Sequence, residues 1–519
     1  MQKYNTPVVR VIVGTGVILL ALAGGAEAQT KVPSGRETQI RAGYGQSIVA
    51  VHPNPASREA RAARADVFYP FPRPRLAGFS PQIAIATSDE NRPPDFEFEH
   101  DLESSYVGLP LNAPANRNFV IGFLDSGASF DLAAGTYANT LGLRGVYLTG
   151  NTVTIGGVGG EVAGTITYPI GYFIAGLSAV DATGALNLNA VVGHSNVSMV
   201  VAPEIDCGNG EVLSAVAGLP LMAFYNSIIR VDTPRRATVG GVTYSGPDIE
   251  LRQPGVPLPV FARKIALEFG GLAPATTANY YLFPDPFDPD TFEEPLIPTL
   301  LSTIPGSPPL GGAFFATLLV IEGEAGPTNP VQEMRVLVDT GAQSSIMSEA
   351  MAANLSLPFE PDFTVDVCGV GGLVTGVPGY FVDYVKMNAR GGALEFSRAP
   401  FVVLDLPAVE GTALDGVLGM NFFWDRNVIF EPSLDASGFF HVSEALPIAY
   451  GDSDVDLDVD DADSAFFMTC FTGADAVVMG PDCDHLDLDE DGDVDLTDFA
   501  WLQACFSGAD LAAEPFCGY

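Results

Sequence analysis

The chain has 519 residues, of which 47% are apolar and 17% charged, and it carries a formal net charge of −39. The length favours two to four domains, and the abundance of glycine (56) and proline (40) favours an all-β globular body over helical bundles. Because a strongly acidic chain repels phosphate backbones, the charge argues against nucleic acid as a partner.

Residues 1–28 have the pattern of a secretory signal peptide. Lys3 and Arg10 precede an apolar run over residues 11–23, and a small-x-small cleavage site ends at Ala28. We predict cleavage there and a secreted, periplasmic or cell-surface mature chain, with a retained membrane anchor as the alternative. No later stretch is long and apolar enough to span a bilayer.

Two further segments lack a sustained strand or helix periodicity. Residues 29–75 are rich in Arg, Pro, Ala and Ser, which predicts a linker or a poorly ordered leader, with a removable pro-segment as the alternative. Residues 246–309 are rich in proline with a few strand-like runs, so we predict a connector between two larger parts.

An apolar strand that ends in a carboxylate, a hydroxyl residue and a glycine occurs twice. These residues are Asp125, Ser126 and Gly127 in the first copy and Asp339, Thr340 and Gly341 in the second. A glycine-rich hairpin tip follows each aspartate by 32 and 30 residues; the two tips are Gly157, Val158, Gly159 and Gly160, and Gly369, Val370, Gly371 and Gly372. Matched spacing indicates an internal duplication, with lobes over residues 76–245 and 310–447.

The duplicated motif has a chemical consequence if the two strand ends meet. Two carboxylates within hydrogen-bonding distance cannot both ionise easily, so Asp125 and Asp339 would share one proton over an acidic range. Ser126 and Thr340 could hydrogen-bond across the pseudo-dyad and hold the loops together. The ionised carboxylate would activate a water while the protonated one polarises a carbonyl, which is peptide hydrolysis without a cofactor or covalent intermediate.

Residues from about 80 to 445 resemble the aspartic peptidases. The resemblance implies a two-lobed β-barrel body, a polypeptide substrate, Asp125 and Asp339 as the catalytic pair, and the two glycine hairpins as flaps. Ala128, Ala342 and the second flap are closer to tandem retroviral-type lobes than to pepsin. Two alternatives stay open: buried turn aspartates in an inert barrel, and an inactive peptidase-like binding protein tethered to an extracellular assembly.

The last 69 residues, from Gly451, contain 19 Asp and Glu and no Lys or Arg. Carboxylates occupy positions 1, 3, 5, 7, 9 and 12 of two twelve-residue loops, which is calcium-loop spacing. The second loop has Gly492 at position 6, whereas Leu457 departs from the pattern in the first; a disordered acidic tail is the alternative. The predicted calcium ligands are Asp487, Asp489, Asp491, Asp493, Asp495 and Asp498, and Asp452, Asp454, Asp456, Asp458, Asp460 and Asp463.

Residues 448–519 resemble dockerin domains of type I, which are pairs of calcium loop–helix repeats that dock on a cohesin partner. Aspartate at position 12 fits that family, and the resemblance implies bound calcium, a small α module and a cohesin-like partner. Equivalent cysteine spacing in the two repeats predicts one disulfide each, Cys470–Cys483 and Cys505–Cys517. The sequence leaves the pairing of Cys207 and Cys368 open.

Overall fold

The computed structural model divides the chain into one unit over Met1–Arg36 and a second over Glu37–Tyr519. In the first unit, β1 (Ile12–Val13) and β2 (Gly16–Val17) pair antiparallel, and the rest of the predicted signal peptide lies outside the described residues. The structure describes residues 12–13, 16–17, 39–41, 47–54, 69, 71–88, 119–143, 148–167, 170–187, 190–208, 211–223, 225–270, 283–285, 288–293, 313–323, 325, 330–406, 414–432, 438–446, 449, 451–453, 458–474, 483, 486–487, 493–509, 511 and 513.

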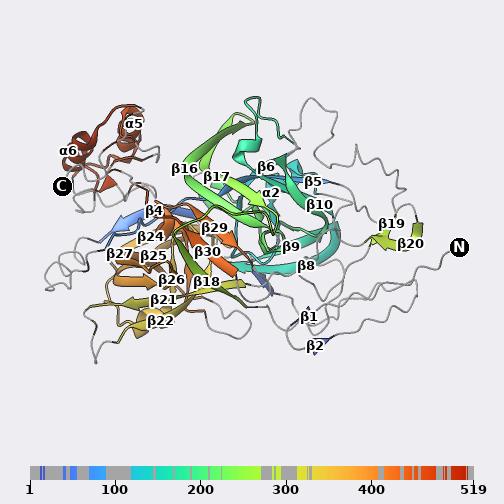
Figure 1. The fold of residues 1–519 in the computed structure, drawn as a ribbon, viewed down its shortest axis with the longest axis horizontal. Coiled ribbons are helices and arrows are strands. Elements are labelled where there is room, and N and C mark those ends of the chain that lie inside the picture. The colour runs from blue at the N-terminus through green and yellow to red at the C-terminus, as the bar shows by residue number, and fades with distance from the viewer. Residues whose placement is uncertain are drawn as a thin grey trace. The chain divides into compact units, whose positions relative to one another are not determined.

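The second unit is mostly β, as expected from composition (Figure 1). One ten-stranded sheet has the order β11-β10-β5-β6-β15-β7-β12-β9-β8-β3. Its strands are β3 (Gln39–Arg41), β5 (Gln82–Ser88), β6 (Val120–Leu124), β7 (Leu132–Ala134), β8 (Leu148–Gly157), β9 (Gly160–Thr167), β10 (Ile170–Gly176), β11 (Val192–Val197), β12 (Val200–Ala202) and β15 (Ala215–Ala217).

A fourteen-stranded sheet has the order β17-β16-β29-β30-β18-β21-β22-β28-β23-β27-β25-β24-β4, with β26 pairing β18. Its strands are β4 (Ser47–Pro53), β16 (Asn226–Val239), β17 (Val242–Arg252), β18 (Arg263–Gly270), β21 (Ala313–Ile321), β22 (Gln332–Val338), β23 (Ile346–Ser348), β24 (Phe363–Gly369), β25 (Gly372–Met387), β26 (Ala389–Arg390), β27 (Leu394–Leu404), β28 (Gly416–Leu418), β29 (Val428–Glu431) and β30 (Gly438–Val442).

Two short hairpins and a few helices complete the described elements. The hairpins are β13 (Asp206–Gly208) with β14 (Glu211–Val212), and β19 (Phe283–Asp285) with β20 (Asp288–Glu293). The helices are α2 (Gly135–Thr140), α3 (Leu219–Met222), α4 (Glu349–Asn354), α5 (Asp461–Cys470) and α6 (Leu496–Cys505), and the 3₁₀ turns are η2 (Leu177–Ala179) and η4 (Met420–Phe423). Of the helices in the described segments, none has the length and apolar character to cross a membrane.

The two copies of the motif repeat the same strand pairings in separate sheets. The strand that leads into each aspartate pairs in parallel with a short strand that ends in an apolar–glycine element: β6 with β15, and β22 with β28. That short strand pairs antiparallel with the strand after the aspartate loop, which is β7 or β23. The latter pairs in parallel with β12 or β27. The pairings therefore repeat along with the sequence pattern.

The closing strands of the two copies join each other. β16 pairs antiparallel with β29, so residues from the first copy extend the sheet of the second. An apolar core lies under this junction, where Phe314 packs edge-on against Phe430 at 5.1 Å and Phe423 lies 4.9 Å from Phe440. Aromatic burial of this kind is a main source of stability in a sheet protein.

The segment predicted to be a linker contains two strands, which corrects that expectation. β3 pairs in parallel with β8, and β4 pairs antiparallel with β24. In β4 only Ile48 and Val51 are buried, three positions apart, so the strand lacks the alternation by which a sequence reveals a strand. Its formation depends on a partner more than 300 residues away, and that dependence leaves no local pattern.

A disulfide links the two copies. Cys207 on β13 is bonded to Cys368 on β24, across 161 residues of sequence. A crosslink that closes so long a loop removes much conformational freedom from the unfolded chain.

Replacing both of these cysteines by serine is expected to lower the free energy of unfolding by about 5 kcal/mol in the loop-entropy description. The matched control is the double replacement of Cys470 and Cys483, whose disulfide spans 13 residues and is expected to contribute about 3 kcal/mol. Chemical denaturation of the oxidised proteins measures both, and an equal loss in the two variants would contradict the loop-length argument.

Candidate active site

Each predicted aspartate directly follows a buried strand. Its backbone N–H is hydrogen-bonded to the end of the short parallel strand beside it, β15 in the first copy and β28 in the second. The Asp125 N–H donates to Ala217 O at 2.9 Å, and the Asp339 N–H donates to Leu418 O at 3.0 Å. Both carboxyl groups are almost fully buried, with 1% and 0% of the residue exposed. The apolar strand ends therefore carry their carboxylates into the interior.

Reciprocal hydrogen bonds join the two aspartate loops. The Ser126 N–H donates to Thr340 Oγ1, and the Thr340 N–H donates to Ser126 Oγ, each at 3.0 Å. Each hydroxyl in turn donates to a carbonyl of the opposite strand end: Ser126 Oγ to Val338 O at 2.8 Å, and Thr340 Oγ1 to Leu124 O at 2.9 Å. The cross-dyad bonding expected from the sequence is present, and it brings the two loops face to face.

The glycines of the motif allow the carboxyl groups to approach. A Cβ on Gly127 would collide with the Asp339 carboxylate, and one on Gly341 would collide with Asp125. The same glycines also supply hydrogen bonds, because the Gly127 N–H donates to Asp125 Oδ1 at 2.7 Å and the Gly341 N–H donates to Asp339 Oδ1 at 2.9 Å. Ala128 adds a second N–H to Asp125 Oδ1 at 2.9 Å.

Burial raises the pKa of Asp125 well above its ordinary value. The charge of Asp339 raises the pKa further, as does a hydrogen bond to that side chain, while the N–H groups of Gly127 and Ala128 lower it. The arrangement thus favours one proton held by the pair at pH values where isolated carboxyls are ionised. Such a pair can act as acid and base at the same time.

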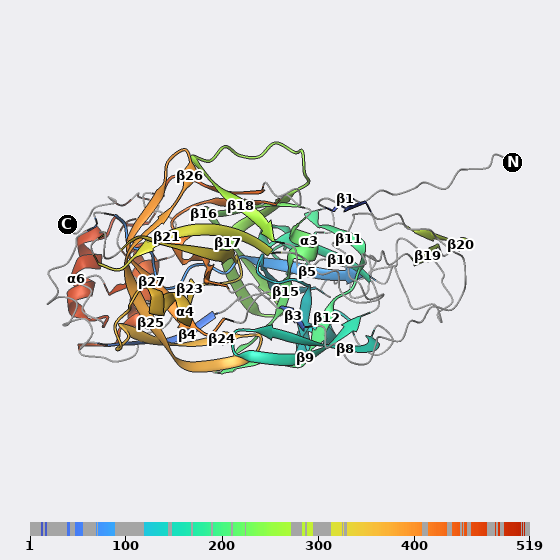
Figure 2. The ribbon, with the colours of Figure 1, turned by 90° about the horizontal axis from the view of Figure 1, so that it is seen from below.

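The two glycine-tipped hairpins predicted from the sequence are present as β8–β9 and β24–β25, which Figure 2 shows from below. Their tips touch: the Gly371 N–H donates to Val158 O at 2.9 Å, and a Cβ on Gly371 would collide with the backbone of Gly159. Val158 belongs to the apolar cluster of the second copy, and Val370 to that of the first. The valine of each tip is therefore buried against the opposite copy.

One buried carboxyl group beside the first loop was missed in the sequence. Asp131, six residues after Asp125, is fully buried, and its Oδ1 accepts the Gly218 N–H at 2.8 Å. The second copy has Ser345 in the equivalent place, where its Oγ accepts the Gly419 N–H at 2.9 Å. Alignment of the two copies was the signal that could have identified it. Burial raises the pKa of Asp131 to about 8.

The C-terminal residues form two similar loop–helix pairs. Asp460 caps α5 by accepting the Ala462 N–H at 2.6 Å, and Asp463 Oδ2 accepts the Asp460 N–H at 2.8 Å. Asp495 and Asp498 form the same capping box at α6. Carboxylates are favourable at helix N-termini, where N–H groups lack partners.

The loops of these two pairs hold each other. The Val459 N–H donates to Ser507 Oγ and the Ser507 N–H donates to Val459 O, both at 2.9 Å. In the equivalent contact, the Val494 N–H donates to Thr472 Oγ1 and the Thr472 N–H donates to Val494 O, both at 2.9 Å. Cys470–Cys483 is disulfide-bonded as predicted. Cys505 is also disulfide-bonded, and its predicted partner lies outside the described residues.

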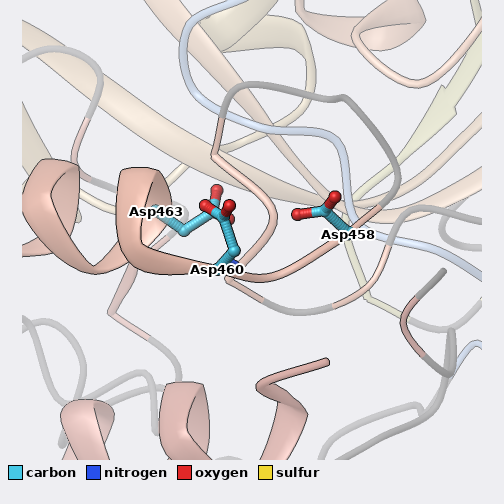
Figure 3. A group of neighbouring side chains, drawn as sticks. All are labelled: Asp458, Asp460 and Asp463. Atoms are coloured by element: carbon cyan, nitrogen blue, oxygen red, sulfur yellow. The ribbon is translucent and has the colours of Figure 1, made fainter. Parts of the chain in front are cut away.

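Part of each predicted calcium ligand set converges at a helix start. Figure 3 shows the Asp460 and Asp463 carboxylates side by side, with Asp458 directed toward them. Three like charges this close repel one another unless a cation neutralises them, and carboxylate oxygens suit calcium. Two other predicted ligands, Asp452 and Asp487, are among the described residues but belong to neither of the two carboxylate groups. Asp454, Asp456, Asp489 and Asp491 lie outside the described residues. The groups whose oxygens lie within 4.8 Å of one another are Asp458, Asp460 and Asp463, and Asp493, Asp495 and Asp498.

Asp131→Asn tests the buried carboxyl group. The folded pKa of about 8 lies above the ordinary value of 3.8, so the folded protein binds more protons between these values. The free energy of unfolding of the parent protein is therefore expected to fall as pH rises from 4 to 8, by up to about 1.4 kcal/mol per pH unit. The variant is expected to lose less stability over this range, because only the contribution of the buried Asp125 remains, whereas Asp206→Asn, at an exposed position, should retain the full loss. Denaturant titrations across pH measure the slopes, and an unchanged slope in Asp131→Asn would overturn the assignment.

Comparisons with known proteins bear on the second copy of the motif. Residues 321–422 match a family model described as aspartyl protease, and this stretch includes Asp339, Thr340, Gly341 and the β24–β25 hairpin. Among solved structures, an aspartic proteinase from Irpex lacteus is similar with a TM-score of 0.35 and 10% identity, over 71% of this chain and 98% of that chain. A search of curated proteins finds no match. The part of the chain that carries the second aspartate loop and the β24–β25 hairpin is thus similar in sequence to the aspartyl protease family.

Proposed function

We propose that this chain is an exported aspartic endopeptidase in which Asp125 and Asp339 activate one water against a peptide bond. The observation that carries the proposal is the burial of these two carboxyl groups against each other, held by the reciprocal bonds of Ser126 and Thr340. The aspartyl protease match over residues 321–422 supports the same reaction class.

In the proposed reaction the carboxyl pair begins with one proton. The ionised member takes a proton from the water as it attacks, and the protonated member donates a hydrogen bond to the carbonyl oxygen. The carboxyl group that took the proton from water later donates it to the leaving amine as the C–N bond breaks. No covalent intermediate forms, and no cofactor is needed for this step. Gly127 and Gly341 leave the space that the two carboxyl groups need to stay in contact.

The two hairpin tips have the role of flaps in this proposal. Main-chain groups of a hairpin edge can bind an extended peptide by adding it as a further strand. Contact between the tips, through Gly371 and Val158, supports closure over the bound peptide. Water exclusion by such closure strengthens electrostatic interactions at the carboxyl pair.

We also propose that the C-terminal module binds calcium and anchors the peptidase to a cohesin-like protein. The two carboxylate groups at the starts of α5 and α6 support the metal. The signal-peptide pattern and the disulfides Cys207–Cys368 and Cys470–Cys483 support export to an oxidising compartment.

Asp125→Asn and Asp339→Asn are each expected to reduce cleavage of a denatured protein substrate by at least about 10²–10⁴-fold, because each removes one half of the acid–base pair. The parent activity is expected to fall as pH rises through the raised pKa of Asp125, where the pair loses its proton. The rate at which fragments are released from the denatured protein, followed across pH 2 to 8, measures both effects.

Glu333→Gln is the matched control, because this exposed carboxylate lies on β22, the strand that leads to Asp339. It should retain the parent rate. Equal inactivity of the parent chain and both aspartate variants at every pH, after removal of the N-terminal leader, would favour a non-catalytic binding protein on the same scaffold.

Calcium is expected to stabilise the C-terminal module, and Asp458→Asn and Asp493→Asn should each weaken that effect. Each variant removes a buried carboxylate from one group. Isothermal titration with calcium and thermal unfolding with and without chelator measure it. Asp461→Asn, an exposed neighbour at the start of α5, is the control. Parent protein that takes up no calcium would contradict the proposed site.

A further inference from the structure

One peptide unit supports the backbone of the first aspartate loop. Its carbonyl group, Ala217 O, accepts the Asp125 N–H at 2.9 Å, and its N–H, that of Gly218, donates to Asp131 Oδ1 at 2.8 Å. A Cβ on Gly218 would collide with Phe130 O, so the unit is packed directly against the chain between the two aspartates. Because a peptide unit is planar and rigid, the Asp131 carboxyl group acts on the Asp125 backbone through a single rigid connection.

The second copy makes the same connection without a titratable side chain. Leu418 O accepts the Asp339 N–H at 3.0 Å, and the Gly419 N–H donates to Ser345 Oγ at 2.9 Å. The Ser345 hydroxyl in turn donates to Asn421 Oδ1 at 2.7 Å. A hydroxyl group accepts one hydrogen bond and donates another without a change of charge, so this connection does not depend on protonation.

The first copy lacks the last member of this chain of hydrogen bonds. Pro220 stands in the place of Asn421, two residues after the glycine. Asp131 is fully buried, and in the part of the chain that the structure describes its Oδ2 has no hydrogen-bond partner. A buried carboxylate with an unpartnered oxygen costs much more free energy than a neutral carboxyl group. The neutral form therefore suits this position.

The elements around Asp131 supply no compensating cation among the described residues. The neighbouring strands β7, β12 and β15 carry only alanine, valine and leucine. The titratable neighbours are Asp125, six residues earlier, and Tyr172 on β10, whose pKa is raised by burial and then by the charge of Asp131. Burial raises the pKa of Asp131 itself to about 8, and the Gly218 N–H only partly opposes that shift.

We propose that Asp131 is a proton-dependent positioning residue for Asp125. Its neutral carboxyl group holds the Ala217–Gly218 peptide unit, and loss of the proton releases the first aspartate loop while the second stays fixed. The catalytic meaning of this inference rests on the proposed peptidase function, but the release itself does not. An ionised Asp131 is solvated only when the packed loop opens to water. Displacement of a catalytic group by about 1 Å is enough to reduce a rate by about 10²-fold.

The direction of the pH effect follows from the pKa of Asp131 in the two forms. With the loop closed this pKa is about 8, and with the loop released it returns toward the ordinary value of 3.8. Between these values the closed form binds more protons, so the ratio of released to closed protein rises with pH by up to about tenfold per pH unit. Above the higher value both forms are ionised, and the ratio becomes constant.

The first test measures release directly, by hydrogen–deuterium exchange and mass spectrometry on the full chain from pH 5 to 8. The opening constants of residues 125–134 and 214–222, corrected for the intrinsic pH dependence of exchange, are compared with those of the equivalent residues 339–348 and 415–423. Their ratio is expected to rise by up to about tenfold per pH unit in the parent. In Asp131→Asn, which keeps an acceptor for the Gly218 N–H without a titratable group, the ratio should stay constant.

Equal changes in the two copies of the parent, or a rise that persists in Asp131→Asn, would overturn the inference. This outcome is independent of proteolysis. A flat exchange ratio in an active enzyme leaves the peptidase proposal standing, whereas a rising ratio in a chain that cleaves nothing supports the release of the loop while the peptidase proposal fails.

The second test compares kcat and KM for a peptide substrate over the same pH range. The ratio of kcat in Asp131→Asn to kcat in the parent is expected to rise by at least about threefold from pH 5 to 7, because only the parent loop is released. KM should change little, since the fully buried Asp131 cannot touch substrate. A kcat ratio that stays constant with pH would contradict the positioning role.

Removal of the acceptor separates positioning from charge. Asp131→Ala leaves the Gly218 N–H without its partner and is expected to lower kcat at every pH, and Asp131→Asn should restore it. Ser345→Ala is the matched control, because it removes the acceptor for the Gly419 N–H in the second copy and should lower kcat without changing the pH profile. Thermal unfolding verifies that each variant is folded, and the exchange ratio in Asp131→Asn decides the question if Asp131→Ala is not.

Discussion

The reciprocal hydrogen bonds between Ser126 and Thr340 are the constraint on which the rest of the structure depends. Each backbone N–H of one loop is bonded to the hydroxyl of the other, and each hydroxyl donates to a carbonyl at the opposite strand end. Four bonds in this closed pattern fix the separation of two strand ends from different sheets. Burial of two carboxyl groups in contact is costly, and this framework keeps Asp125 and Asp339 together despite their repulsion.

The tips of the β8–β9 and β24–β25 hairpins show the same reciprocity away from the carboxyl pair. Val158 is buried in the apolar cluster of the second copy and Val370 in that of the first, so neither tip can leave without exposing apolar surface. The Cys207–Cys368 disulfide makes the two hairpins unequal, because it links only the β24–β25 hairpin to the opposite copy. Departure from symmetry also appears at Asp131, where the second copy has a serine.

The C-terminal module uses duplication in a similar way on a smaller scale. Each loop is bonded to the residues that follow the helix of the other repeat, through Val459 with Ser507 and Val494 with Thr472. These hydrogen bonds therefore require both repeats. The acidic groups concentrate at the helix starts, where capping orders them, and this order distinguishes the module from a solvated acidic tail.

The sequence by itself determined the mostly β character, the duplication, the strand ends that carry Asp125 and Asp339, and the Cys470–Cys483 pair. These features depend on residues close together in the chain, or on the same local pattern occurring twice. Only the tertiary structure decided the pairing of Cys207 with Cys368, the burial of Asp131 and the pairing of β3 with β8 and of β4 with β24. Each of these depends on contacts between distant segments, and a strand stabilised by such a partner, like β4 with its two buried residues, needs no alternation of its own.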